Sequence, residues 1–348
     1  MNNRRRRNPR DPRKKRRHFH KWLIPLLALL LLPVLLLAYL NFNLNKINRK
    51  TPQKSIDPAI ETLDKRGFED LFKDADKNIR DNVSDNLLWY HEDVYNVLLA
   101  GLDYGGKEGF KDQYYPRADA LLLVSANRHT RVVTVVSLSR ASYVAIPGFA
   151  NGRINLGHAY GGAKLLVQTV EHNYKVRVDA FMTVDFDGFV TLIDIMGGVN
   201  ITLDQAEYDA LAAAFQLGDG PGTYLLNGGE ALAYARLRYI DSDRARTERQ
   251  RKILRQLASE TRRLSMNQIR DCINGILPLV TTDLGNLELM SLLPYAGYRI
   301  TEAVIPRKAV PLTVVNGQEV LLLNWSNVRS DVHDLLYPGM IPAQAAGS

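Results

Sequence analysis

The residues from Arg236 to Arg251 combine arginines with carboxylates at a spacing that could bind phosphate. The segment reads RLRYIDSDRARTERQR and holds six arginines around Asp241, Asp243 and Glu248. A guanidinium stays charged and presents a planar fork of donors that matches phosphate oxygens in pairs. Such a cluster is what a site for a metal-bound pyrophosphate would need; the alternative is a solvated helix with charged faces.

The spacing within this segment favours a pocket. Arg236 and Arg238 would diverge by about 200° on a helix, so they can act together only where the backbone leaves the helix. A new helix is predicted from Asp243, which is a plausible cap. Gln250 and Arg246 extend the apolar stripe of this helix toward its start, and the stripe itself is formed by Leu254, Leu257, Thr261 and Leu264. Polar residues on a buried stripe are well placed to line a site.

Four other charged segments lie where predicted strands begin or end. They are Gly101–Asp103, Arg117–Ala120, Ser139-Arg140 and RINLGHAYGG, Arg153 to Gly162. Sheets of α/β proteins place their sites at strand ends and at strand-to-helix junctions. These segments are therefore candidate partners for the arginine cluster.

Hydrophobic periodicity predicts strands alternating with helices. Helices are expected after Gly161-Gly162, over 187–196 and over most of 228–296. Strands or extended pieces are expected at 94–102, 118–124, 132–138, 142–147, 181–186, 199–203, 300–305 and 320–323. This order predicts an α/β fold, an α–β–α sandwich with a mixed central sheet.

The N-terminal part predicts a membrane anchor. Residues 22–40 read WLIPLLALLLLPVLLLAYL, nineteen residues without a charge, and arginine-rich sequence precedes them. That length is just enough for the hydrocarbon core of a bilayer. By the positive-inside rule the N-terminus is predicted to be cytoplasmic, with the C-terminal domain extracytoplasmic and the protein a single-pass protein of the cell membrane. A cleaved signal peptide is the alternative, but no A-x-A site follows the apolar run.

The distribution of charge along the chain supports the prediction of a membrane anchor. Residues 1–50 hold fourteen Lys or Arg and one acid, so the other 298 residues carry 31 basic and 36 acidic side chains. The net charge of +8 therefore belongs to the tail, which needs no role in nucleic-acid binding beside a membrane span. Cys272 is the single cysteine, which excludes an intramolecular disulfide, and no histidine shows zinc-ligand spacing.

These patterns divide the chain into five parts. The predicted parts are a basic tail at 1–21, a transmembrane helix at 22–40, a stalk and membrane-proximal helical segment at 41–90, a domain at 91–270 that carries the candidate site and a C-terminal segment at 271–348 that completes or extends it. The last residues, ending IPAQAAGS, are expected to be a loose tail.

Seven segments in order resemble the LytR-CpsA-Psr cell-wall glycopolymer transferases. They are GLD, RAD, LSR, RINLGHAYGG, DFDGFVTLIDIMGGV, LNGGEALAYARLR and D-x-x-R-x-x-RQ, and they span roughly residues 94–265. The resemblance implies a protein that binds a polyprenyl-pyrophosphate-linked glycan and moves the glycan phosphate onto a peptidoglycan sugar hydroxyl.

The resemblance also implies roles for individual residues. Asp103 and Asp119 would hold Mg²⁺, and hard carboxylate oxygens suit that ion. Arg140, Asp119 and Arg117 would carry the catalysis. The pyrophosphate would be bound or its ligands oriented by Arg117, Arg140, Arg153, Arg236, Arg238, Arg246, Arg249, Gln250 and Asp243.

The chain departs from the usual family pattern at several positions. Ala141 stands where the family usually has an aspartate after arginine, Tyr104-Gly105 follow the first aspartate without an arginine, and Arg244-Ala245 replace Phe-Gly. The loss at Ala141 leaves open a catalytically weakened protein that binds the lipid-linked glycan. A polyprenyl-pyrophosphate hydrolase is a third reading, and a membrane-anchored transcription regulator, resting on the basic tail alone, is a fourth.

Overall fold

The computed structural model describes residues 44–47, 49, 87–104, 113–237, 240, 243–261, 271, 274–275, 277–315 and 317–346. The predicted basic tail, the predicted membrane span at 22–40, most of the predicted stalk and Cys272 lie outside these residues. Within the described part, no helix combines the length and the apolar character that a bilayer crossing requires. The described residues from Ile47 onward belong to one compact unit.

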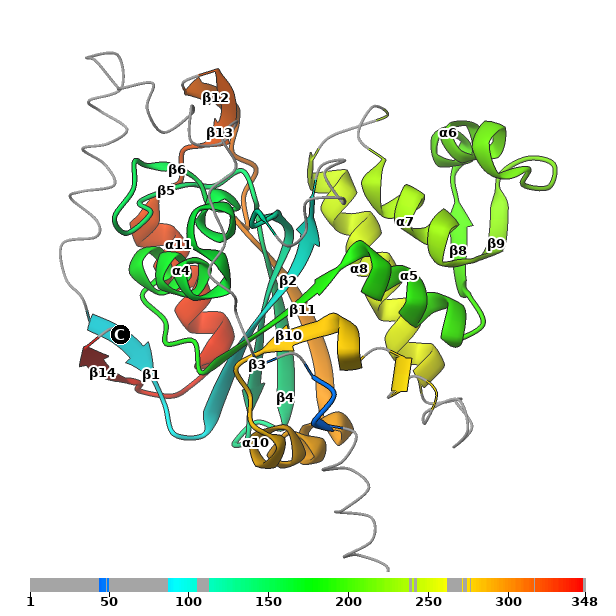
Figure 1. Cartoon of the computed structure of the whole chain (residues 1–348). Helices are drawn as coiled ribbons and strands as arrows, with labels where there is room; N and C mark the ends of the chain where they lie inside the picture. Colours follow the sequence, from blue (N-terminus) through cyan, green and yellow to red (C-terminus); the bar gives the residue numbers. More distant parts are fainter. Residues whose placement is uncertain are drawn as a thin grey trace, which may run out of the picture. The chain divides into compact units, whose positions relative to one another are not determined.

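A six-stranded mixed sheet forms the centre of this unit (Figure 1). The spatial order is β10 (Val280–Thr282), β7 (Ala180–Asp185), β2 (Val94–Asp103), β3 (Arg117–Asn127), β4 (Val132–Leu138) and β11 (Arg299–Ile305). The β7–β2 and β4–β11 pairs are parallel, and the other three neighbouring pairs are antiparallel. The predicted α/β class with a mixed sheet is confirmed.

Side chains alternate between the two faces of the sheet, as they do along any strand. On β2, Leu98, Ala100 and Leu102 belong to the main hydrophobic core. Leu99, Gly101 and Asp103 lie between them in sequence and line a cavity on the other face. One strand thus supplies both the core and the floor of a pocket.

The main core lies under α4 (Leu156–Tyr174) and α11 (Trp325–Leu336). These two helices lie on one side of the sheet in Figure 1. Helix α4 is interrupted by non-helical backbone at Gly161 and Gly162: its longer segment starts after the glycine pair, as predicted, and a short helical segment at 156–160 that was not predicted precedes it.

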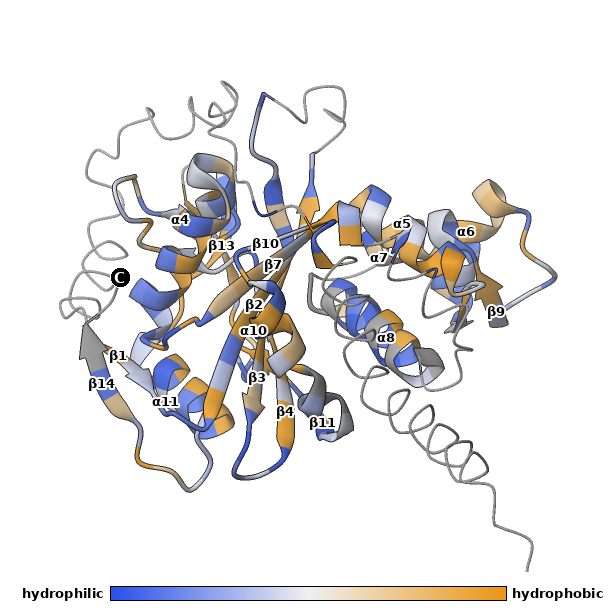
Figure 2. Cartoon of the chain, turned by 60° about the horizontal axis from the view of Figure 1, so that its bottom comes forward, coloured by the Kyte–Doolittle hydropathy of each residue, from blue (hydrophilic) through white to orange (hydrophobic). Residues whose placement is uncertain are grey.

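Helices α5 (Phe186–Ile195), α7 (Gly228–Arg236) and α8 (Asp243–Thr261) lie on the other side of the sheet in Figure 1. Helix α10 (Asn286–Ser291) packs near the lower end of the strands through Leu289 and Leu292, the residue after the helix. In Figure 2 the central strands are largely hydrophobic and hydrophilic residues gather on α8. A second core joins α5, α7 and α8 to α6 (Gln205–Phe215) and to the two-stranded sheet of β8 (Val199–Leu203) and β9 (Gly222–Leu226).

Short pairs complete the unit. Hairpin β12 (Leu312–Val315) and β13 (Gln318–Leu321) is one, and β5 (Tyr143–Val144) with β6 (Gly152–Arg153) is another. Strand β1 (Leu87–Tyr90) pairs antiparallel with β14 (Ala343–Ala346). Two 3₁₀ turns, η3 (Leu277–Leu279) and η4 (Leu293–Gly297), flank β10 and α10.

The C-terminal part differs from the sequence prediction. The expected loose tail is wrong for 343–346, which form β14. Strands β9 and β10 and helix α11 were not predicted, and β10 and β11 both belong to the central sheet. Val199–Leu203 is a strand as predicted, but it lies in the small β8–β9 sheet.

Candidate functional site

Charged residues gather at one edge of the central sheet. Strands β2, β7 and β4 end at this edge and β3, which is antiparallel to β2 and β4, starts there. Asp103 ends β2, Asp185 ends β7, Arg140 follows β4, and Asp119 is near the start of β3. The topology therefore brings together residues that lie far apart in the sequence.

Asp119 occupies a β-bulge. In the β2–β3 ladder Gly101 pairs with Ala120 and Leu102 with Ala118, so Asp119 is the extra residue. Both Asp119 and Ala120 then line the cavity, while Ala118 and Leu121 pack in the core. A bulge re-aims a side chain in this way, and bulges are frequent beside active sites.

The Asp119 carboxylate is held from two sides. Arg140 Nη1 lies 2.6 Å from one carboxylate oxygen, and Asn155 Nδ2 donates to the other at 3.0 Å. The Asp119 and Arg140 side chains are only 13% and 15% exposed, so this ion pair is largely shielded from solvent. Charge-assisted hydrogen bonds of this kind fix orientation strongly.

Arginines from two helices face the carboxylates. Arg236 ends α7, and its Nη2 lies 3.6 Å from the carboxylate of Asp103. Its guanidinium also stacks over the ring of Phe186, with 4.6 Å between Cζ and the ring centroid. Arg246 and Gln250, one turn apart on α8, line the same cavity.

The cavity between the sheet and helices α5, α7 and α8 has a volume of about 300 Å³. Its polar end is formed by Asp103, Asp119, Asp185, Arg236, Arg246 and Gln250. Most of its wall is apolar, with Leu99, Leu122, Met182, Val184, Phe186, Phe189, Leu192, Leu232, Ile253 and Val280. Such a shape suits an amphipathic ligand with an anionic head and a long apolar body.

The structure brings together only some of the predicted site residues. Arg117 is exposed at the start of β3, and it is not among the lining residues. Arg153 Nε donates to the carbonyl of Glu319 in β13 at 2.8 Å, and it too is absent from the lining.

Arg249 also points away from the cavity. Its side chain is buried, and Nη2 donates to the carbonyl of Leu237 at 2.8 Å. Arg238 lies outside the described residues, and only the backbone of Asp243, which starts α8, is described.

Three residues of the site were not predicted from the sequence. Asp185 and Phe186 sit at the β7–α5 junction, and Asn155 precedes α4. Asp185 also caps α5 by accepting from the amide of Gly188 at 3.0 Å. The signal was present in the strand-to-helix junction at D-F-D-G-F, whereas nothing in the sequence alone indicates which carboxylate Asn155 contacts.

Two further residues, one in the candidate segment 153–162 and one directly after Arg140, are buried and make packing or backbone contacts. His158 is buried, with Nδ1 2.8 Å from the Pro116 carbonyl and its ring edge-on to Tyr115. It is a packed histidine in the first turn of α4. Ala141 is 4% exposed and its carbonyl accepts from the amide of Leu321 at 2.8 Å.

The carboxylates suit a metal that shares its coordination with a ligand. Among the described residues, no group of three or more His, Cys, Asp or Glu lies close enough together to hold a metal ion. Mg²⁺ is usually bound through one or two carboxylates together with substrate phosphates and water. Asp103 and Asp119 both line the cavity, and they could supply the one or two carboxylates that such a shared Mg²⁺ site needs.

Fold and site together define a class: an α/β protein whose apolar pocket ends in arginine–carboxylate pairs suited to an anionic head group. The sequence model of the LytR_cpsA_psr family matches residues 62–329. The chain belongs to this family.

Similar proteins carry transferase names. The chain is 30% identical over 308 residues to "Polyisoprenyl-teichoic acid--peptidoglycan teichoic acid transferase TagU" of Oceanobacillus iheyensis, covering 84% of this chain and 86% of that protein. It is 35% identical over 181 residues to the TagT transferase of Bacillus subtilis, covering 50% and 55% of the two chains.

Solved structures share the fold. "TagT bound to LIIa-WTA" aligns with a TM-score of 0.56 and 25% identity, over 70% of this chain and 91% of that one. TagT "with bound octaprenyl pyrophosphate lipid" aligns with a TM-score of 0.54 and 24% identity, over 70% and 91%. At this identity the second match speaks for the fold alone.

Proposed function

We propose that this protein transfers a glycopolymer with its phosphate from a polyprenyl-pyrophosphate carrier to a sugar hydroxyl of peptidoglycan. The observation that carries the proposal is the cavity, in which an apolar wall ends at Arg236, Arg246, Asp103 and Asp119. A polyprenyl pyrophosphate has the same division into an apolar chain and an anionic head. The names of the similar transferases support the same substrate class.

The charged end can perform the chemistry of phosphoryl transfer. The acceptor hydroxyl attacks the glycan-side phosphorus, the bond to the bridging oxygen breaks, and polyprenyl phosphate leaves. Arg236 and Arg246 stabilise the negative charge that develops on the transferring and leaving groups. The hydroxyl proton passes to one of the carboxylates that line the cavity, of which Asp185 is a candidate beside the two predicted metal ligands.

Mg²⁺ is part of the proposal. Held by Asp103 and Asp119, it would neutralise pyrophosphate oxygens and assist departure of the leaving group. Removal of divalent ions with EDTA should abolish transfer, and added Mg²⁺ should restore it.

The proposal also includes a single-pass anchor at residues 22–40, with the N-terminus cytoplasmic and the domain on the outer face of the membrane. Its support is the uncharged run and the basic residues before it. An engineered cysteine in the C-terminal domain should react with a membrane-impermeant label on intact cells. Absence of labelling would contradict this orientation.

The test of activity uses the purified full chain in detergent with a polyprenyl-pyrophosphate glycan, Mg²⁺ and peptidoglycan. Transfer should be seen for the wild type and lost in Asp119→Ala. Phosphate products released without an acceptor would favour a hydrolase and contradict the proposal.

A second candidate is a protein that binds the lipid-linked glycan without turning it over. The observation behind it is Ala141, whose buried methyl group stands where the family usually has an aspartate. Tight binding without transfer in the same assay would favour this candidate, and Ala141→Asp would then be expected to restore turnover.

A further inference from the structure

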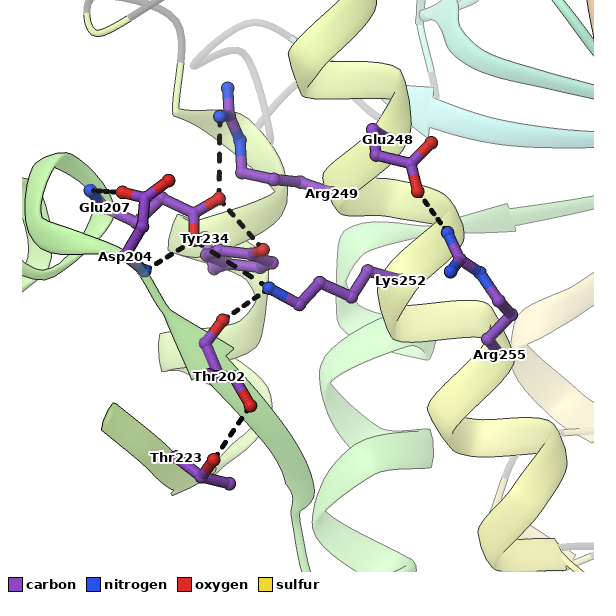
Figure 3. Close-up of polar contacts among 9 residues, drawn as sticks. All are labelled: Thr202, Asp204, Glu207, Thr223, Tyr234, Glu248, Arg249, Lys252 and Arg255. Carbon is purple, nitrogen blue, oxygen red and sulfur yellow. Dashed lines mark hydrogen bonds and ion pairs between the residues drawn. The ribbon is translucent and has the colours of Figure 1, made fainter. Parts of the chain in front are cut away.

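Helix α8 presents two different polar faces. Arg246, Gln250 and Ile253 line the cavity. Arg249 and Lys252 instead point toward α6, α7 and β8, as Figure 3 shows. The motif R-x-x-RQ, which at first looks like one phosphate-binding unit, is therefore divided between the pocket and a neighbouring cluster.

Glu207 is the centre of that cluster. Its side chain is 9% exposed, and it lies in the first turn of α6. Its Oε1 accepts from Tyr234 Oη at 3.0 Å and lies 3.8 Å from Arg249 Nη1. Its Oε2 accepts from the amide of Asp204 at 3.2 Å and lies 3.9 Å from Lys252 Nζ (Figure 3).

Burial makes this cluster depend on its pairing. The side chain of Arg249 is only 3% exposed, and an unpaired charge in such surroundings is costly. Burial also raises the pKa of Tyr234, and the neighbouring Glu207 carboxylate raises it further, so the tyrosine stays a hydrogen-bond donor. The three side chains hold one another in a fixed arrangement.

Arg249 connects this cluster to the active-site backbone. Its Nη2 donates to the carbonyl of Leu237, the residue after Arg236. Leu237 caps α7 with a ψ of 122°, so the helix ends and the chain becomes extended at this point. The contact therefore fixes where α7 ends and from which direction Arg236 reaches Asp103.

We infer that Arg249 and Glu207 are positioning residues: they do not contact the pyrophosphate, and they hold the Leu237 carbonyl so that Arg236 faces the cavity. The inference deepens the proposed function and rests on it for the choice of ligand. It assigns Arg249 a role different from the one that the family resemblance implies.

A double-mutant cycle tests this role, with the binding of a polyprenyl pyrophosphate to the full chain in detergent as the readout. Arg249→Met should weaken binding about tenfold, within the range of couplings in one network. In an Arg236→Met background the same change should alter the Kd less than about twofold, because the residue that Arg249 positions is gone. An equal loss in both backgrounds would mean that Arg249 binds the ligand independently, which overturns the inference.

Lys252→Met is the matched control. Lys252 contacts the same Glu207 carboxylate, but its hydrogen bond goes to the carbonyl of Thr202 in β8 and not to Leu237. Lys252→Met should lower the melting temperature and leave the Kd unchanged. A change in Kd equal to that of Arg249→Met would show that both variants act through general destabilisation, which would overturn the inference.

Arg249→Lys provides a second variant if Arg249→Met does not fold. It keeps the charge beside Glu207 but cannot bridge to Leu237, so it should repeat the non-additive pattern. Binding of the lipid without glycan transfer would contradict the proposed function and leave the inference standing, whereas an absence of binding by the wild type would overturn both.

Discussion

Asp119 is held in place before any substrate arrives. Arg140 and Asn155 occupy its two oxygens, and the bulge turns its side chain toward the cavity. A site arranged in this way loses little free energy to reorganisation when charge develops during the reaction. In the proposed reaction we therefore expect Arg140 to affect the rate through the Asp119 carboxylate that it holds.

Replacement of Arg140 should affect turnover far more than folding. Arg140→Ala should lower the transfer rate by roughly 10²–10³, the usual effect of removing one preorganised electrostatic group. Arg255→Ala is a suitable control because Arg255 does not line the cavity; it pairs with Glu248 on α8 (Figure 3) and with Glu302 on β11. The measurement is the initial transfer rate of each variant below its melting temperature. Equal rates for Arg140→Ala and Arg255→Ala would contradict a role of Arg140 in the reaction.

Asn155 offers a subtler test at the same carboxylate. Asn155→Leu removes the donor at 3.0 Å from Asp119 but leaves the ion pair with Arg140. We expect a loss of about tenfold in rate or somewhat more, with little change in substrate affinity, since one hydrogen bond to a charged group contributes about 1.5–3 kcal/mol. A change confined to KM would show that Asn155 acts on binding instead.

The types and spacing of the residues predicted most of the charged side chains of this site. They did not predict which arginines point into the cavity. Arg246 and Gln250 were correctly predicted to face a pocket because they continue an apolar stripe. Arg249 is one residue from Gln250, and its direction depends on Glu207, a residue far away in sequence. No local pattern contains that information.

The packing of helix α7 against α5 sets the position of the arginine-bearing end of α7. A Cβ on Gly228 would lie 2.4 Å from the carbonyl oxygen of Val190, which is backbone and cannot rotate away. The glycine at this position therefore permits a close approach of the two helices. Phe186 at the start of α5 and Arg236 at the end of α7 owe their contact to this approach.

Alanine substitutions at the adjacent glycines 228 and 229 test this close approach of the helices with a matched control. Gly228→Ala should destabilise the protein by about 1–3 kcal/mol because it overpacks the interface between the helices. Gly229→Ala should be neutral or stabilise by up to about 1 kcal/mol through helix propensity, since its Cβ would meet only Asn227 Oδ1 at 3.4 Å. Urea unfolding of both variants measures the difference, and similar stabilities would contradict the close-packing argument.

Elements with long, regular patterns were predicted well, whereas short ones were not. β4 was predicted at its observed bounds because it is a run of β-branched residues. β10 has three residues, and β9 exposes Leu225, so neither carries a clear period. Helix α11 was not predicted, although Trp325, Val328 and Val332 follow one another at helical spacing and are buried on one side.

At the scale of the whole molecule, buried tyrosines connect distant parts of the chain. Tyr337, at the end of α11, donates from Oη to the carbonyl of Trp89 in β1 at 2.9 Å and accepts from Asn96 in β2. Burial raises the pKa of Tyr337 to about 12, and it raises the pKa of Tyr174 to about 12 as well. Both phenols are therefore held protonated in the folded protein.

This burial predicts a loss of stability at alkaline pH. A pKa raised above the unfolded value of 10.0 gives a contribution that is complete below pH 10 and is lost as the pH rises toward about 12. The free energy of unfolding should be measured by urea titration at pH 8, 10 and 11. We expect it to be lower at pH 11 than at pH 10.

Tyr337→Phe supplies the control for the alkaline prediction. It should cost about 1 kcal/mol at pH 8 through the lost hydrogen bond, and its further loss at pH 11 should be smaller than that of the wild type. An identical pH dependence in both proteins would rule out Tyr337 as a source of the alkaline loss.

The pairing of β1 with β14 has a consequence for how the chain matures. β1 is the first strand of the described unit and β14 is the last, so the edge of β1 that pairs with β14 stays open until residues 343–346 have been synthesised. An open strand edge invites aggregation and proteolysis. A polypeptide that stops before residue 343 therefore keeps that edge of β1 exposed and is a better substrate for proteases than a chain in which β1 and β14 have paired.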